Sequence, residues 1–159
     1  MSHASLCRLT HYNVAQDGNE LSFGFQIVFE DNSTTDFTET ITVPIAITHP
    51  DDPCLQRILQ SLHIGLAISY YKLYFPPKIE HPYKLSATAA DFWNSVYRNG
   101  LGEFMYTNKL HANDLATFHG DAPATNVTQL PTNQSAILGI GGGKDSIVGY
   151  ETLKKLQIP

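Results

Sequence analysis

The chain has 159 residues, of which 42% are hydrophobic and 16% are charged, so it is long enough for one domain with a buried core. Its net charge of -5, with no basic stripe, argues against nucleic-acid binding. The first residues lack the hydrophobic stretch of a secretion signal, and no hydrophobic run approaches the length of a membrane span. We therefore expect a soluble, cytoplasmic protein that binds neither nucleic acid nor membranes.

The first 43 residues predict antiparallel strands. Residues 21–30 alternate between hydrophobic and polar or small side chains, which gives one hydrophobic face with a period of two. Residues 31–33 supply a turn, residues 34–43 return with β-branched side chains, and residues 6–14 are the expected third strand. Such a small meander has to pack its hydrophobic face against another element.

A long helix from Pro53 to about Phe75 is the expected cover. Asp51-Asp52 offers an N-cap, and Pro76-Pro77 ends the helix. A second helix is predicted from Ser86 to Gly100, and a short helix or turn over residues 102–110. The hydrophobic stripe expected on the long helix consists of Leu55, Ile58, Leu59, Leu62, Leu66, Tyr70 and Leu73.

Composition divides the chain into three parts. Residues 1–111 predict an α+β domain, an antiparallel meander packed on helices. Residues 112–135 are rich in Ala, Thr, Asn, Pro and Gly without a sustained period, which indicates a linker or surface loop. Residues 136–159 predict the start of a truncated α/β domain, in which a strand over residues 136–140 feeds a glycine-rich turn that opens a helix.

That turn reads Gly141-Gly142-Gly143-Lys144-Asp145-Ser146, and its position before a helix is typical of a phosphate site. Three glycines let the backbone N–H groups approach an anion, because no side chain blocks it. Ser146 offers a helix cap and a hydroxyl group, and Lys144 offers a positive charge. A carboxylate beside phosphates is repulsive unless a divalent cation lies between them, so Asp145 predicts a Mg²⁺-bound nucleotide.

Other glycine-rich motifs fit this turn poorly. A Walker A loop needs Gly where Leu138 stands and Ser or Thr where Asp145 stands. The third glycine of a dinucleotide fingerprint would fall on Lys144 or Ser146. The turn resembles the S-G-G-x-D-S loop of enzymes that cleave ATP between its α and β phosphates, with Gly141 in place of the first serine. The alternative is a flexible glycine hinge, which the Lys-Asp-Ser sequence disfavours.

A second candidate cluster spans Asn99–Asn108, where glycines, two amides, Glu103 and Tyr106 occur within ten residues. Such a mixture can bind a polar ligand. The alternative, a helix C-cap at Gly100 followed by a solvated turn, is slightly favoured by composition alone. The seven histidines show no metal-ligand spacing.

The order of these motifs along residues 58–153 resembles the N-terminal part of the UDP-N-acetylmuramoyl-L-alanyl-L-glutamate epimerase family. Tyr71 stands where this family is expected to have tryptophan. The resemblance is carried by Ser69-Tyr70-Tyr71-Lys72, Pro76-Pro77-Lys78-Ile79, the Trp-containing helix, Asn99–Asn108 and the loop Gly141–Ser146.

The resemblance implies an enzyme of peptidoglycan precursor synthesis, using ATP and Mg²⁺ to invert the terminal L-Glu of a UDP-muramoyl dipeptide to D-Glu. It implies that Gly141, Gly142, Gly143 and Ser146 hold the phosphates, that Lys144 offsets developing charge, and that Asp145 helps to hold Mg²⁺. The implied candidates for substrate contact or proton transfer are Glu103, Tyr106 and Lys72, with Lys144 as a catalytic cation. Base and acid stay unassigned, and the oligomeric state stays open.

A βαβ unit needs a second parallel strand, and the chain ends at Pro159, where that strand would begin. We therefore expect the 159 residues alone to be inactive, and a strand over residues 136–140 to lack partners. Two alternatives remain. One is another ATP-pyrophosphatase-loop enzyme, an adenylating ligase or a tRNA-modifying enzyme. The other is a non-enzymatic interaction domain.

Overall fold

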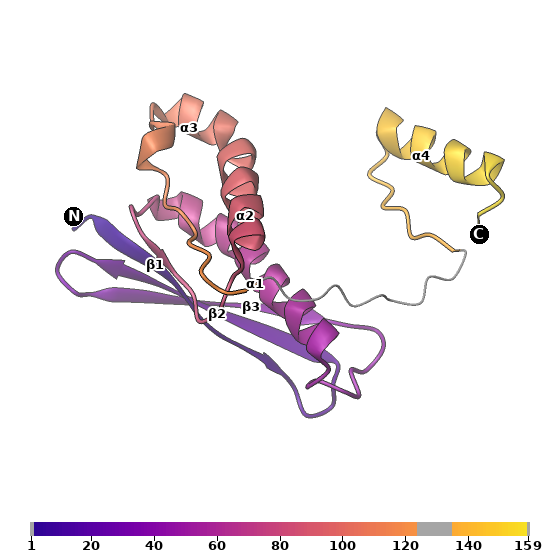
Figure 1. The fold of residues 1–159 in the computed structure, drawn as a ribbon, viewed down its shortest axis with the longest axis horizontal. Helices are drawn as coiled ribbons and strands as arrows, with labels where there is room; N and C mark the ends of the chain where they lie inside the picture. Colours follow the sequence, from indigo (N-terminus) through magenta and orange to yellow (C-terminus); the bar gives the residue numbers. More distant parts are fainter. Residues whose placement is uncertain (1, 124–134, 159) are drawn as a thin grey trace. The chain divides into compact units, whose positions relative to one another are not determined.

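The computed structural model describes residues 2–123 and 135–158 (Figure 1). The chain divides into two compact units, Met1–Thr125 and Asn126–Pro159. The first unit is α+β, as predicted, and holds a sheet and three α-helices. Among the described residues, no helix is long and hydrophobic enough to cross a bilayer.

The sheet of the first unit has four strands in the order β3-β2-β1-β4. β1 (Ala4–Val14), β2 (Glu20–Phe29) and β3 (Thr34–Thr42) form the predicted antiparallel meander. The sequence did not predict β4 (Ile79–Glu80), which pairs with β1 in parallel. Two residues carry no periodic signal, so this strand is defined only by the hydrogen bonds of its neighbour.

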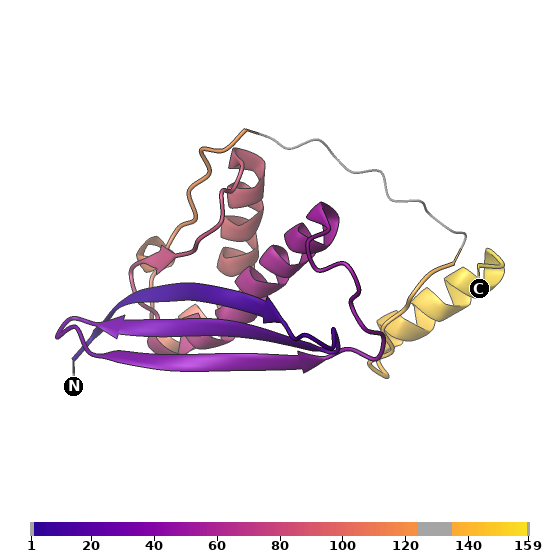
Figure 2. The ribbon, with the colours of Figure 1, turned by 90° about the horizontal axis from the view of Figure 1, so that it is seen from below.

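β2 carries the core of the first unit. Its residues Leu21, Phe23, Phe25 and Ile27 are all buried, which confirms the predicted hydrophobic face. Phe25 pairs with Leu9 on β1 and with Phe37 on β3, so the same face continues across the sheet. The helices of the first unit lie over one face of the sheet (Figure 2).

Residues next to α1 (Pro53–Tyr74) determine where the helix begins and ends. The Asp52 carboxylate accepts hydrogen bonds from the backbone N–H groups of Cys54 and Leu55, both at 2.9 Å. The helix ends at Phe75, whose φ of 46° lies in the left-handed region, directly before Pro76. The predicted boundaries are therefore confirmed.

The buried face of α1 differs from the predicted stripe. Leu59, His63, Ala67 and Tyr71 face the core at spacings of four residues, and Ile64 is buried beside them. The prediction is wrong for two residues of the stripe, because Ile58 is 53% exposed and Leu73 is 64% exposed. Each position turns the helix by about 100°, so choosing the face by hydrophobicity alone missed the contribution of buried histidine and alanine.

Two further helices follow, α2 (Ala87–Gly100) and α3 (Gly102–Asn108). Both agree with the prediction, and the Ser86 hydroxyl group caps α2 by accepting from the N–H of Ala89 at 3.3 Å. The 3₁₀ turn η1 (Ala112–Asp114) comes next.

The segment predicted as a linker or surface loop, residues 112–135, begins inside the first unit. Leu115, Ala116 and Phe118 are buried in its core. The N–H of Ala116 donates to the Tyr71 hydroxyl group at 2.9 Å. The described part of the segment, up to residue 123, therefore packs with the first unit beyond the boundary that composition indicated. Residues 124–134 lie outside the described residues.

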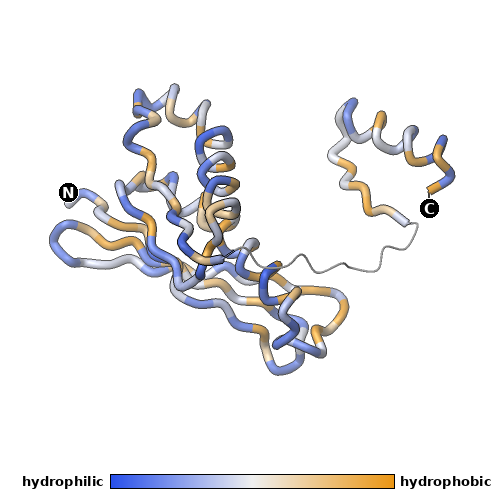
Figure 3. Tube along the Cα trace, in the orientation of Figure 1, coloured by the Kyte–Doolittle hydropathy of each residue, from blue (hydrophilic) through white to orange (hydrophobic). Residues whose placement is uncertain are grey.

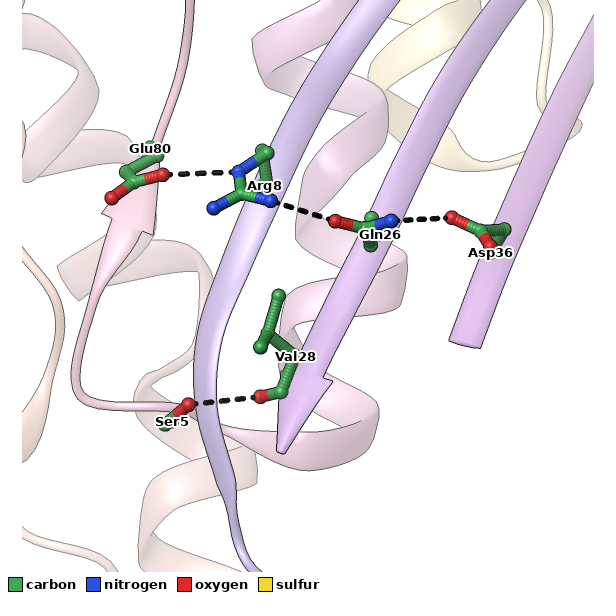
Figure 4. A network of polar contacts seen from close by, with 6 residues as sticks. All are labelled: Ser5, Arg8, Gln26, Val28, Asp36 and Glu80. Carbon is green, nitrogen blue, oxygen red and sulfur yellow. Dashed lines mark hydrogen bonds and ion pairs between the residues drawn. The ribbon is translucent and has the colours of Figure 1, made fainter. Parts of the chain in front are cut away.

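The solvent face of the sheet carries a chain of polar contacts that links all four strands (Figure 4). Arg8 on β1 pairs with Glu80 on β4 at 3.0 Å and donates to the Gln26 side chain on β2 at 2.8 Å. Gln26 then donates to Asp36 on β3 at 2.9 Å. Gln26 and Phe25 are neighbours on β2, so this polar row lies on the face of the sheet opposite to the Phe25 side chain.

The second unit contains α4 (Lys144–Lys155), as predicted. The strand expected over residues 136–140 is not formed; these residues, described in the structure, have no regular secondary structure. A strand requires a hydrogen-bonded neighbour, and no other strand is present among the described residues of this unit. Hydrophobic residues occur along this segment and within α4 (Figure 3), and Ile137, Ile140 and Val148 are exposed.

Candidate functional site

The glycine-rich loop Gly141–Ser146 has an open backbone. Gly142 has a φ of 78°, a conformation that favours glycine. A Cβ atom placed on Gly141, Gly142 or Gly143 would meet no atom within 4 Å. Packing inside the protein therefore does not require three glycines here, whereas close approach by a ligand would require them.

The loop leads directly into the N-terminus of α4. Gly143 occupies the N-cap position, and no side chain caps the helix. The prediction that Ser146 caps α4 is therefore wrong: its hydroxyl group donates to the carbonyl oxygen of Gly143 at 2.8 Å. Because helix geometry leaves the N–H groups of the first turn without intrahelical acceptors, residues 144–146 present donors to an anion.

Lys144 and Asp145 are both exposed at this helix start. Among the described residues, no three His, Cys, Asp or Glu side chains gather closely enough to hold a metal ion. Mg²⁺ in nucleotide sites is usually bound by one or two carboxylates together with the phosphates. Asp145 provides a single exposed carboxylate beside the N–H groups of the helix start, an arrangement that would suit such a site.

A second site lies where the end of α1 meets α3. A cavity of about 370 Å³ is lined by Lys72 and Glu103, together with Gly100 and Asn108. The structure thus brings together two candidates that are 31 positions apart in sequence. Tyr106, the third candidate, does not line this cavity and is 88% exposed. Lys72 in a last helical turn and Glu103 in a first turn also suit the helix dipoles, a reason for these charges that is independent of any ligand.

A third site, which we call the α1–α2 cavity, was not predicted from the sequence. It has a volume of about 620 Å³ and lies between α1, the segment 82–86 and α2. Arg57, Lys84 and Trp93 contribute to its lining. The α1 residues that line it share one face of the helix, but the sequence did not mark this face as a site: Pro53, Gln56, Arg57, Gln60, Ser61 and Ile64.

A buried histidine supports one wall of the α1–α2 cavity. His63 is fully buried; its Nε2 lies 2.9 Å from the carbonyl oxygen of Gly24, and its Nδ1 lies 2.5 Å from the hydroxyl oxygen of Tyr83. A carbonyl only accepts, so Nε2 carries the proton and Nδ1 accepts from Tyr83. Burial lowers the pKa of His63 and raises that of Tyr83, so both are neutral at neutral pH.

A comparison with protein-family models shows to which family this chain belongs. The family model described as the MurL N-terminal domain matches residues 2–159. The chain belongs to this family. The resemblance seen in the sequence is thereby confirmed.

Curated relatives agree with this family. A protein of a Micromonospora species named UDP-N-acetyl-alpha-D-muramoyl-L-alanyl-L-glutamate epimerase is 33% identical over 152 residues, covering 91% of this chain and 33% of the relative. A protein of the same name from Xanthomonas oryzae pv. oryzae is 35% identical over 133 residues, covering 80% of this chain and 30% of the relative. The chain thus spans about a third of the length of these relatives. No solved structure matches.

In this MurL N-terminal domain, the candidate residues fall into separate units. Lys72, Glu103 and Tyr106 belong to the first unit, and the loop Gly141–Ser146 belongs to the second. The sequence named the loop, Lys72 and Glu103 as candidates, but it offered no sign that the side chains of Lys72 and Glu103 line one cavity. The α1–α2 cavity requires two helices to face each other, which no single motif encodes.

Proposed function

We propose that this chain is the N-terminal part of an ATP- and Mg²⁺-dependent epimerase. Its substrate is UDP-MurNAc-L-Ala-L-Glu, whose terminal L-Glu it inverts to D-Glu during cytoplasmic synthesis of peptidoglycan precursors. The observation that carries the proposal is the uncapped, glycine-led N-terminus of α4 in a chain of this family. The relatives' name supplies the epimerisation and its substrate.

Epimerisation needs removal of an α-proton next to a carboxylate, which would concentrate negative charge on one small group. ATP supplies an adenylyl group, with release of pyrophosphate, so that the carboxylate loses its charge and the α-proton becomes more acidic; water releases AMP only after the carbon has been inverted. A base removes the α-proton, and an acid returns a proton to the opposite face of the same carbon. This sequence explains why an isomerase would carry a loop for ATP phosphates.

Each residue of the loop has a role in this proposal. The N–H groups of Gly141, Gly142 and Gly143 and the Ser146 hydroxyl group bind the phosphates. Lys144 offsets the charge that develops on the leaving pyrophosphate. Asp145 holds Mg²⁺ beside the phosphates.

The Lys72–Glu103 cavity is the proposed place for substrate contact or proton transfer in the first unit. It contains a cation and a carboxylate, which are suited to a substrate carboxylate and to proton exchange. Tyr106 takes part only if another surface covers it, because its side chain is 88% exposed.

We further propose that the 159 residues alone do not catalyse the reaction, because they span about a third of the relatives. The isolated chain is then expected to show no tight, Mg²⁺-dependent binding of ATP. Equilibrium dialysis with labelled ATP, with and without Mg²⁺, measures this directly. Tight Mg²⁺-dependent binding would refute the proposed dependence on further chain.

The activity is tested by isotope exchange of pyrophosphate into ATP, using a version with the full length of the relatives. We expect exchange only when the muramoyl dipeptide and Mg²⁺ are both present. Asp145→Asn should abolish most of it, and Asp121→Asn, an exposed carboxylate of the first unit, serves as the matched control. Exchange that does not depend on the dipeptide would sink the epimerase assignment and leave another adenylating enzyme.

A further inference from the structure

The α1–α2 cavity has two helical walls whose residues repeat at helical spacing. On α1, positions 53, 56, 57, 60, 61 and 64 face it, and on the α2 side Ser86, Ala89 and Trp93 do so. The core face of α1, centred on Leu59 and His63, is a different face of the same helix. The cavity therefore lies between two regular helices, on a side of α1 that is turned away from Leu59 and His63.

The charges of this cavity have one sign. Arg57 from α1 and Lys84 from the segment before α2 both line it, and no carboxylate does so among the described residues. The chain as a whole carries a net charge of -5. Two cations from different elements on an acidic protein, with the amide group of Gln60 beside them in the lining, indicate an anionic ligand.

Trp93 adds a flat aromatic surface to this cationic cavity. It is the single tryptophan of the chain, and its side chain is half-buried. Gly65 on α1 lies next to this ring: a Cβ atom there would sit 3.7 Å from the nearest indole carbon, so α1 packs against the indole. A supported aromatic face beside cations is suited to a ligand that joins a planar ring to phosphates.

Tyr83 is held rigidly at the wall of the same cavity. Its hydroxyl group is fixed by the neutral His63, which is itself anchored to the backbone of β2 at Gly24. Its ring stacks on His81 at 5.9 Å between centroids. The wall is therefore organised before any ligand arrives, which lowers the entropic cost of binding.

We propose that the α1–α2 cavity binds a nucleoside diphosphate group, with the base on Trp93 and the phosphates between Arg57 and Lys84. A volume of about 620 Å³ is within the usual range of about 300–1,000 Å³ for small-molecule sites. Its identification as the UDP part of the substrate rests on the proposed function. The first unit then anchors the constant end of the substrate, and the dipeptide end extends from it.

The fluorescence of Trp93 tests this proposal on the 159-residue chain, because no other tryptophan contributes. UDP is expected to change the emission saturably. Uridine and inorganic pyrophosphate should each bind at least about tenfold more weakly, since each satisfies only one half of the site. ADP should also bind more weakly than UDP. Absence of a saturable change with UDP would overturn the proposal, and ADP binding as tightly as UDP would overturn the identification of the ligand as the UDP part of the substrate.

Charge variants localise the site. Arg57→Gln and Lys84→Gln should each raise the Kd for UDP about tenfold or more, because each removes a charged contact to phosphate. Arg98→Gln and Lys78→Gln remove the same charges from exposed positions that do not line the cavity, and should leave the Kd unchanged. Equal effects of both pairs would overturn the placement. Far-UV circular dichroism checks that each variant is folded.

The proposed stacking of the base on Trp93 is tested by calorimetry, because variants without Trp93 lack the fluorescence signal. Trp93→Ala should weaken UDP binding about tenfold, and Trp93→Phe less, since phenylalanine keeps a stacking surface. Unchanged binding by Trp93→Ala would overturn the stacking. The assay of pyrophosphate exchange into ATP distinguishes this proposal from the proposed function. Exchange without UDP binding in the α1–α2 cavity would reject only the UDP site. UDP binding without exchange would reject only the adenylation step.

Discussion

The two units of this chain bury their hydrophobic residues to very different extents. In the first unit, Phe23, Phe25 and Ile27 are at most 1% exposed. In the second, α4 has no buried residue among those described, and Ile147 and Val148 are 60% and 64% exposed. Burial of hydrophobic surface is the main source of folding free energy. The first unit therefore carries the stability, and the second carries a loop whose backbone is open to a ligand.

The largest expected effect is a loss of unfolding free energy on substitution in the core of the first unit, compared with a substitution in the second unit. Phe25 contacts His63 and Tyr70, with ring centroids 4.8 and 4.5 Å apart. Phe25→Ala should lower the free energy of unfolding by about 3–5 kcal/mol, because it leaves a cavity in the core. Tyr150→Ala on α4, where the side chain is 52% exposed, should change it by no more than about 0.5 kcal/mol. Urea denaturation measures both, and equal losses would show that the second unit shares the core.

The second prediction concerns histidines, which occur in the first unit and are absent from residues 126–159. Burial lowers the pKa of His63 and of His81 from 6.5. The unfolded chain then binds more protons, so this contribution to stability is fully present above pH 6.5 and is lost as pH falls through the lower folded pKa values. The unfolding free energy should thus decrease from pH 7 towards pH 5.

Substitution identifies the groups responsible for that slope. The double variant H63Q/H81Q should flatten the dependence between pH 5 and 7, measured by urea denaturation at each pH. His111→Gln, at an exposed position, is the matched control and should keep the slope of the parent chain. An unchanged slope in the double variant would contradict the assignment.

The third prediction compares the two helix starts. Asp52 closes the N-terminus of α1 with two hydrogen bonds of 2.9 Å, whereas Gly143 leaves that of α4 open. Asp52→Ala should cost about 1 kcal/mol of stability. Asp51→Ala, the neighbouring carboxylate, and Ser146→Ala should each cost less than about 0.5 kcal/mol. Thermal unfolding followed by circular dichroism measures this; a loss with Ser146→Ala equal to that of Asp52→Ala would mean that α4 is capped after all.

The same contrast explains how far the sequence could predict the structure. The period of β2, the cap at Asp52 and the break at Pro76 are local signals, and each appears in the structure as expected. The strand predicted over residues 136–140 requires a neighbouring strand for its backbone hydrogen bonds, so a hydrophobic sequence alone is not enough to form it. On α1, His63 and Ala67 face the core in place of Ile58 because the neighbouring strands, not the helix, select the buried face.

The candidate sites divide in the same way. The loop Gly141–Ser146 is contiguous, so a role could be proposed for each of its residues from the sequence alone. Lys72 and Glu103 came from separate motifs, and their shared cavity depends on the meeting of α1 with α3. The α1–α2 cavity depends on which face α1 leaves outside the core, and that face was assigned wrongly in part.

The smallest expected effect compares one ion pair from each unit. Arg8 and Glu80 join β1 to β4 at 3.0 Å, with side chains 42% and 57% exposed. Glu151 and Lys154 lie 4.0 Å apart on α4, with similar exposure. Glu80→Gln should cost at most about 1 kcal/mol, because exposed pairs are screened by water and salt. Its cost should nevertheless exceed that of Glu151→Gln, because Arg8 also binds Gln26 and so belongs to a network across the sheet. Urea denaturation at low salt and at about 1 M salt measures the loss of unfolding free energy in both variants. The loss caused by Glu80→Gln should be smaller at high salt. A loss with Glu151→Gln as large as that with Glu80→Gln would mean that α4 contributes to the cooperative fold.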